Sequence, residues 1–258
     1  MRWLNKKLIL ELVKRDFEEK FAGSILGRLW SFISPLVNIL IYILIFSNIM
    51  SARLSGVDSE FSYSIYLISA ILPWTAFSIT ISRCTTVLMD KKNIISKINI
   101  SLPSMPLYIS LSETLTLFIS TGIFLVLLII SGHGLSEYIL LIPFIFMLQQ
   151  LLAYSIGLIL SVTTVFIKDL KELVGLVLQV WFWFTPIVYV KDILPEWVSR
   201  IIVFNPFYIL ADSYQKIFLW KEVPETDGLI ILTAITFSLL FLSYFVYAKL
   251  ESDVKDFL

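Results

Sequence analysis

The sequence is poor in the residues that catalytic and metal sites use. It has one cysteine, Cys84, and one histidine, His133, in 258 residues, which excludes a disulfide within one chain and a Cys/His metal cluster. Its nine glycines never form the G-x-x-x-x-G-K-[ST] loop that cradles nucleotide phosphates. No Ser-His-Asp set and no pair of catalytic carboxylates can be assembled. We expect a non-enzymatic chain with no metal and no cofactor of its own, so any work against a gradient draws its energy from another subunit or from an ion.

Charged residues are also scarce, and they come in clusters. Asp, Glu, Lys and Arg make up 16% of the chain, against about 25% in soluble domains, and 58% of the residues are hydrophobic. Mean hydropathy is +0.87. The twenty basic and twenty acidic residues cancel, and we expect no nucleic-acid partner. The composition predicts an integral membrane protein.

Long apolar runs predict an all-α fold with six membrane-spanning helices in one domain, residues 1–258. The predicted spans are Ile33–Met50, Tyr63–Ser82, Leu107–Ser131, Tyr138–Phe166, Leu173–Val190 and Leu229–Ala248. Each is near or above the roughly 20 residues that a crossing needs. Fifteen of the twenty Lys and Arg residues fall on the side that holds both chain ends. The positive-inside rule therefore places both termini in the cytoplasm.

The N-terminal segment, residues 1–28, predicts an amphipathic helix on the membrane surface. Its apolar positions are Leu10, Val13, Phe17 and Phe21, and its charged positions are Lys7, Glu11, Lys14, Arg15 and Glu18. We expect Glu11 to pair with Arg15, and Asp16 with Lys20, at i,i+4 spacing. A stiff cytoplasmic helix that runs directly into the first span is typical of a protein that passes force from a cytoplasmic partner into the membrane.

The loop of residues 84–103 is basic and amphipathic. The residues expected to contact a partner are Lys91, Lys92, Asn93, Ile94, Ile95 and Lys97. Ile94, Ile95 and Ile98 form an apolar edge at helical spacing, which favours a small helix that docks into a partner's cleft. The alternative is a solvated loop that follows the positive-inside rule.

The outer segment, residues 191–228, contains an apolar stretch from Pro195 to Trp220 that we do not interpret as another span. Arg200 and Asp212 would then lie in the bilayer at several kcal/mol each. Asn205 and Pro206 suit an N-cap and a first helical position, so they divide the stretch into two short helices. We expect a re-entrant helix pair, and the alternative is a helix lying flat on the outer leaflet.

Aromatic side chains suggest a channel lining, because flat rings suit the C–H faces of sugars. The candidates are Tyr42, Phe46, Trp181, Trp183, Phe184, Phe207 and Tyr208. Four consecutive aromatic residues, Trp181–Phe184, cannot all face lipid on one helix. The alternative for each residue is an anchor at the membrane interface.

Four ionisable residues lie near the cytoplasmic membrane surface. Arg15, Arg28 and Arg83 are placed to meet a lipid headgroup or a pyrophosphate, for which the arginine fork is suited. Glu113 lies in the third span, where it either pairs with Arg83 or forms a proton or ion site.

Several of these stretches resemble the membrane permease subunits of ABC-2 type transporters, and most closely the bacterial exporters of O-antigen, capsule and teichoic-acid polymers. The first block of similarity combines Arg15-Asp16, Ser24-x-Leu26-Gly27-x-x-Trp30 and Pro35. The second is KINISLPSMPLYISLSE, and the third is the outer segment with Asn205-Pro206. The similarity extends along nearly the whole chain.

The resemblance implies a homodimer with a channel between the protomers, in the bacterial inner membrane. It implies an interface helix near Trp3–Ala22 and a coupling helix near Met89–Ile100, which rest on two copies of a cytoplasmic ABC ATPase that binds ATP and Mg²⁺. The outer hairpin with Asn205 and Pro206 would be the outer gate. The cargo would be a polysaccharide on undecaprenyl pyrophosphate.

Three other functions stay open. An ABC-2 exporter of a small lipophilic drug would have the same span pattern. An ion-coupled carrier would use Glu113. An integral membrane enzyme acting on lipid-linked sugar lacks a convincing set of catalytic residues.

Overall fold

The computed structural model describes residues 6–20, 22–49, 61–97, 100–191 and 194–257. Within these ranges every regular element is a helix, as the sequence predicts. Phe21, Ile98 and Asn99 lie outside the described residues. The elements, in chain order, are α1 (Lys6–Glu19), η1 (Gly27–Leu29), α2 (Trp30–Ile43), η2 (Leu44–Ile49), α3 (Ser62–Asp90), α4 (Lys92–Ile95), α5 (Ser104–Ile130), η3 (Glu137–Leu141), α6 (Ile142–Thr164), α7 (Leu170–Trp183), α8 (Glu196–Ile202), α9 (Pro206–Gln215), η5 (Lys216–Trp220) and α10 (Thr226–Phe257).

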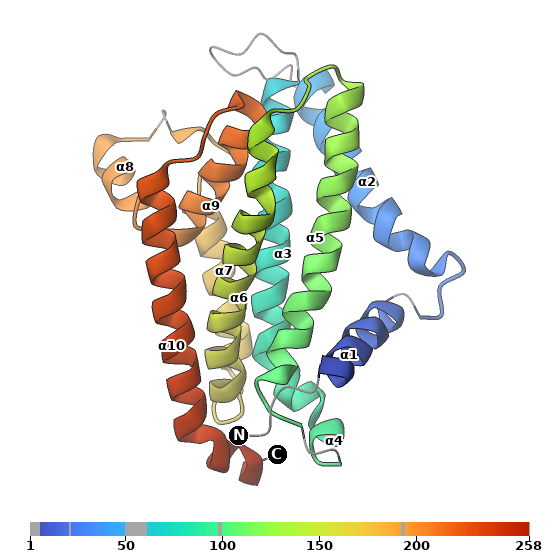
Figure 1. Ribbon diagram of the computed structural model, residues 1–258, viewed down its shortest axis with the longest axis vertical. Coiled ribbons are helices and arrows are strands. Elements are labelled where there is room, and N and C mark those ends of the chain that lie inside the picture. The colour runs from blue at the N-terminus through green and yellow to red at the C-terminus, as the bar shows by residue number, and fades with distance from the viewer. Residues whose placement is uncertain (1–5, 21, 50–60, 98–99, 192–193, 258) are drawn as a thin grey trace.

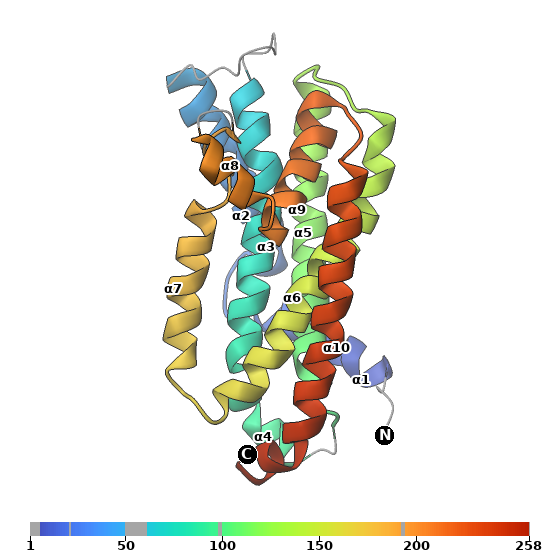
Figure 2. The ribbon, with the colours of Figure 1, turned by 90° about the vertical axis from the view of Figure 1, so that its left-hand side faces the viewer.

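Five helices of the described chain are long and apolar enough to cross a membrane, which confirms an all-α membrane fold. They are Gly27–Ser47, Ser62–Asp90, Ser104–Ile130, Glu137–Thr164 and Thr226–Phe257. The long helices run side by side in one bundle (Figure 1). The start of α1 and the end of α10 lie at the same end of that bundle in both views (Figures 1 and 2).

The predicted helix through Leu173–Val190 is wrong in its extent. Helix α7 has 14 residues, which span about 21 Å, short of the roughly 30 Å hydrocarbon core. It ends at Trp183 because Pro186 has no N–H to continue the ladder and disfavours a helical Thr185 before it. The Thr185 hydroxyl instead donates a hydrogen bond to the carbonyl oxygen of Trp181, at 2.9 Å.

Helix α3 forms the centre of the bundle. In the apolar 18-residue stretch that marks α3 as a span, 72% of the residues are buried. The corresponding share is 11% for the first span and 17% for α10. It lies against α5, α6, α7 and α9. At the α6 contact, a Cβ atom on Gly157 would lie only 2.6 Å from the Cβ of Cys84, so a glycine there permits the close approach. The exposed outer faces of α2 and α10 are apolar and suit contact with lipid or with a second chain.

The outer segment divides at Asn205 as predicted. Asn205 caps α9, because its Oδ1 accepts from the backbone N–H of Phe207 at 3.0 Å. Helix α9 packs against α3, α6 and α10 and buries most of its side chains, so it enters the bundle and does not lie flat. Helix α8 stands beside the bundle with Trp197 68% exposed (Figures 1 and 2).

The predicted interface helix and the predicted coupling helix differ in extent from the helices of the structure. Helix α1 (Lys6–Glu19) ends three residues before Ala22, the predicted end of the interface helix, and its predicted start at Trp3 lies outside the described residues. The predicted coupling helix, Met89–Ile100, is a single turn, Lys92–Ile95, because α3 continues to Asp90 and takes the first two of those residues.

Candidate functional site

A cluster of four charged side chains joins the N-terminal helix α1 to the spans α3 and α5. Arg83 of α3 donates from Nη1 to Glu113 Oε1 of α5 at 2.5 Å and from Nη2 to Asp16 Oδ1 of α1. Lys20, just after α1, reaches the same Glu113 oxygen at 3.4 Å. Asp16 also accepts from the hydroxyl of Ser112, at 2.5 Å. One arginine therefore holds three helices together.

The inner face of α1 differs from the prediction. Its buried residues are Ile9, Val13 and Asp16, which lie on one stripe at i,i+4,i+7 spacing. Leu10, expected on the apolar face, is 66% exposed. The face of α1 that packs against the protein is therefore not the predicted one. It includes the carboxylate of Asp16 as well as apolar side chains, because Asp16 forms an ion pair with Arg83.

The predicted pairing along α1 is also wrong. Asp16 pairs with Arg83 of another helix, and Arg15 pairs with Glu19 at 2.5 Å. The hydrogen bond from the Arg15 guanidinium is the main cause that holds the pKa of the Glu19 carboxyl below its usual range, and the positive charge of Lys91 adds to it.

Glu113 forms the ion pair that the sequence predicts with Arg83. Its carboxylate is fully buried, and two acidic and two basic side chains meet in the cluster, so the formal charges balance. A balanced cluster of this kind joins helices firmly, because removing one member of a buried pair leaves a charge without compensation, at about 3–5 kcal/mol.

The three arginines predicted to meet a pyrophosphate are not brought together. Arg83 is occupied by Asp16 and Glu113. Arg28 extends from the turn before α2 to Glu18 at 2.5 Å. Arg15 and Arg28 are exposed, so a phosphate role stays a prediction for these two side chains.

The turn of α4 lies against both α1 and the protein core. Lys91 reaches Glu19 of α1 at 3.3 Å. Ile94 and Ile95 are half-buried and pack against the cluster of apolar residues at this end of the bundle, so this part of the apolar edge faces inward. Among the residues predicted to contact a partner, Lys92, Asn93 and Lys97 are exposed, and for these three the contact stays a prediction.

The predicted aromatic lining falls into two groups. Phe207 is fully buried, with its ring centroid 4.8 Å from that of Trp74 and 4.9 Å from that of Phe77, so it is part of the protomer's core. Tyr208 is also buried. The accessible members are Tyr42, Phe46 and Trp181, which are half-buried, and Trp183 and Phe184, which are exposed. For this second group, a lining role stays a prediction.

Asn205 connects the outer segment to the end of α7. Its Oδ1 accepts from the indole N–H of Trp181 at 2.7 Å, and its Nδ2 donates to the hydroxyl of Thr185 at 2.9 Å. Trp181 in turn packs edge-on against Phe77, 5.4 Å between ring centroids. A movement of α7 would therefore be transmitted directly to the start of α9.

A groove of ≈ 240 Å³ between α2 and the pair α3 and α5 has mostly apolar walls. The charged Lys20 and Glu113 line it, and so do six neutral polar residues. Those residues are Ser31, Ser34, Asn38, Thr75, Thr116 and Ser120, with the rings of Trp30 and Tyr42 beside them. They come from α2, α3 and α5, so no local sequence pattern predicts that they share one groove. Hydroxyl, amide and aromatic groups together are the chemistry that binds neutral sugars.

Comparison with known proteins gives consistent results. The model of the family described as ABC-2 type transporter matches residues 7–219. The O-antigen export system permease protein RfbA of Myxococcus xanthus is 25% identical over 251 residues, 96% of this chain and 94% of the relative. Two proteins of the same name come from Klebsiella pneumoniae. One is 27% identical over 213 residues, which are 82% of this chain and 80% of the relative. The other is 26% identical over 252 residues, which are 97% of this chain and 95% of the relative. The chain belongs to the ABC-2 type transporter family.

Proposed function

We propose that this chain is the membrane-spanning permease subunit of an ATP-driven exporter, and that the cargo is a polysaccharide on an undecaprenyl pyrophosphate lipid. Family membership supports a transport role. The relatives named as O-antigen export permeases match over most of their length, which favours a polymer over a small lipophilic drug.

The observation that carries the proposal is the charged cluster of Asp16, Arg83 and Glu113. It connects a helix outside the membrane to two helices inside it, which a conduit that opens without outside force does not need. A push on α1 or on the neighbouring turn of α4 would reach α3 and α5 through Arg83. The ATP and Mg²⁺ would be bound by two copies of a separate cytoplasmic ATPase.

The exposed apolar faces support a homodimer in the bacterial inner membrane, with α1 and both chain ends in the cytoplasm. Helix α2 and helix α7 each bury only two residues in the protomer. Two copies that meet along these helices would enclose the groove and the exposed rings of Trp183 and Phe184. Asn205 and Pro206 would couple the outer end of that path to α7.

The test is expression of a tagged chain with the ABC ATPase of its own export system. We expect the two to purify together, and we expect deletion in the host to leave lipid-linked polymer in the cytoplasm. Lys92→Glu and Lys97→Glu on α4 should weaken the copurification, whereas Lys168→Glu, an exposed change in the loop after α6, should not. Full transport by this chain alone in liposomes, without any ATPase, would refute the proposal.

A further inference from the structure

A second pocket lies on the side of the bundle where α5, α6 and α10 meet. Its volume is ≈ 420 Å³, within the range of about 300–1,000 Å³ that ligand pockets occupy. Its walls run from Leu107 to Phe118 along α5, about 16 Å of helix. Leu111, Met147 and Phe118 line it and are 40–58% exposed, so the pocket opens on the outer surface of the bundle, which faces lipid.

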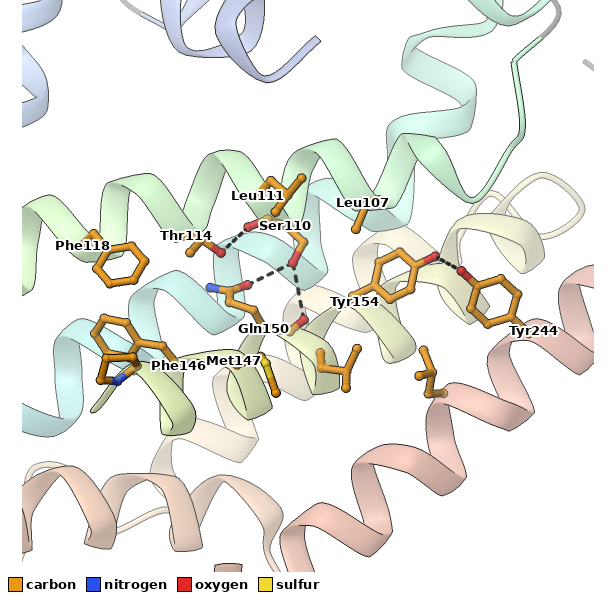
Figure 3. A pocket seen from close by; sticks show the side chains of 13 residues that line it. Leu107, Ser110, Leu111, Thr114, Phe118, Phe146, Met147, Gln150, Tyr154 and Tyr244 are labelled. Atoms are coloured by element: carbon orange, nitrogen blue, oxygen red, sulfur yellow. Dashed lines mark hydrogen bonds between the residues drawn. The ribbon is translucent and has the colours of Figure 1, made fainter. Parts of the chain in front are cut away.

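One polar group in this pocket has no partner. Gln150 is 7% exposed, and its Oε1 accepts from Ser110 Oγ at 3.2 Å and from Thr80 Oγ1 at 3.4 Å. Its Nε2 has no hydrogen-bond partner among the described residues. Figure 3 shows this nitrogen directed toward the end of the pocket marked by Phe118 and Phe146. A buried amide donor needs an acceptor, and water could serve only where several polar groups meet it, which the apolar rings at that end do not provide.

The depth of Gln150 in the membrane follows from the helix geometry. Ser110, which contacts it, is three residues before Glu113 on α5, so it lies about 4.5 Å nearer to the α1 end of the bundle. Charged groups avoid the hydrocarbon, so the ion pair of Glu113 with Arg83 marks the interfacial zone. At the same end, the hydroxyls of Tyr154 and Tyr244 meet at 3.0 Å (Figure 3). The pocket thus begins at headgroup depth and extends toward the middle of the bilayer.

We propose that this pocket is a binding site for one glycerophospholipid of the leaflet on the α1 side. An ester carbonyl of the lipid accepts from Gln150 Nε2, its headgroup lies beside Tyr154 and Tyr244, and one acyl chain runs past Met147 to Phe118. A polyprenyl phosphate fits less well, because its acceptors are all on the phosphate and none lies at the start of its chain. The site is separate from the groove between α2 and α3, and the inference does not depend on which cargo is exported.

The experiment compares two photoactivatable lipids in nanodiscs of phosphatidylethanolamine and phosphatidylglycerol. Both are phosphatidylethanolamines with a diazirine in the chain, and one carries ester links where the other carries ether links. We expect label to concentrate on peptides of α5, α6 and α10, with the ester lipid labelling about five times more than the ether lipid, the effect of one hydrogen bond. Gln150→Leu should abolish the ester preference, and Gln179→Leu on the exposed face of α7 should keep it.

A second variant keeps the test decisive if Gln150→Leu fails to fold. Leu240→Trp narrows the pocket from α10 without touching the Gln150 hydrogen bonds, and it should reduce label on α5 and α6 for both lipids. Label spread evenly over all lipid-facing helices, equal labelling by the ester and ether lipids in the unmodified protein, or displacement of the label by a polyprenyl phosphate would each overturn the proposal.

Discussion

Replacing Arg83 by methionine tests how strongly the charged cluster joins α1 to the spans. Methionine keeps much of the length and apolar volume of the arginine stem but removes its charge. Asp16 and Glu113 are both buried, and after the change only Lys20, at 3.4 Å from Glu113, remains to compensate two carboxylates. The unfolding free energy should fall by about 3 kcal/mol, toward the lower end of the cost of breaking a buried pair, because Arg83 is partly exposed.

A loss of that size is measurable by thermal unfolding of the purified protein in detergent micelles, followed by circular dichroism. For a chain of this size, about 3 kcal/mol corresponds to a fall in Tm of about 6–12 °C. The matched control is Arg15→Met, which removes an arginine that pairs with Glu19 at the surface. Exposed pairs contribute at most about 1 kcal/mol, so the control should change Tm by a few degrees at most.

Charge balance gives the sharper test. Adding Asp16→Asn to Arg83→Met leaves one buried carboxylate, Glu113, opposite Lys20, and the cluster is neutral again. The double variant should therefore be more stable than Arg83→Met alone, although Asp16→Asn destabilises the unmodified protein. If the two losses simply add, or if Arg83→Met is as mild as Arg15→Met, the four charged side chains do not act as a balanced unit.

Two further predictions concern packing and capping. Gly157→Ala should lower the unfolding free energy by about 1–3 kcal/mol, since its new Cβ would lie 2.6 Å from the Cβ of Cys84. Gly122→Ala, with open space around it, should be neutral or stabilising. Equal Tm values for the two variants would contradict this prediction. Asn205→Ala should cost about 1–3 kcal/mol, from the lost cap and from the unpaired indole of Trp181. Asn205→Asp keeps the accepting oxygen and should recover most of that loss in the same melting assay; no recovery would show that the cap is not the cause.

Much of the fold follows from hydropathy and helix signals, and the exceptions have local causes. The long apolar helices were predictable because a bilayer requires about 20 apolar residues in one run. The cap at Asn205 was predictable because Asn is favoured at the N-cap and Pro at the first helical position. The end of α7 was not, because the apolar run continues to Val190 while Pro186 stops the helix earlier. Hydropathy measures where a segment lies and says little about where its hydrogen-bond ladder ends.

The site was less predictable than the fold, and Asp16 shows why. The helical periodicity of α1 assigns Asp16 to neither face, and the i,i+4 rule pairs it with its own neighbour Lys20. The true partner, Arg83, is 67 residues away, and no local pattern records that distance. Gln150 is a second case, since a single amide in an apolar run is compatible with any interhelical contact. In a membrane bundle, isolated polar residues in apolar helices are therefore the positions where sequence periodicity says least and where tertiary contacts decide the role.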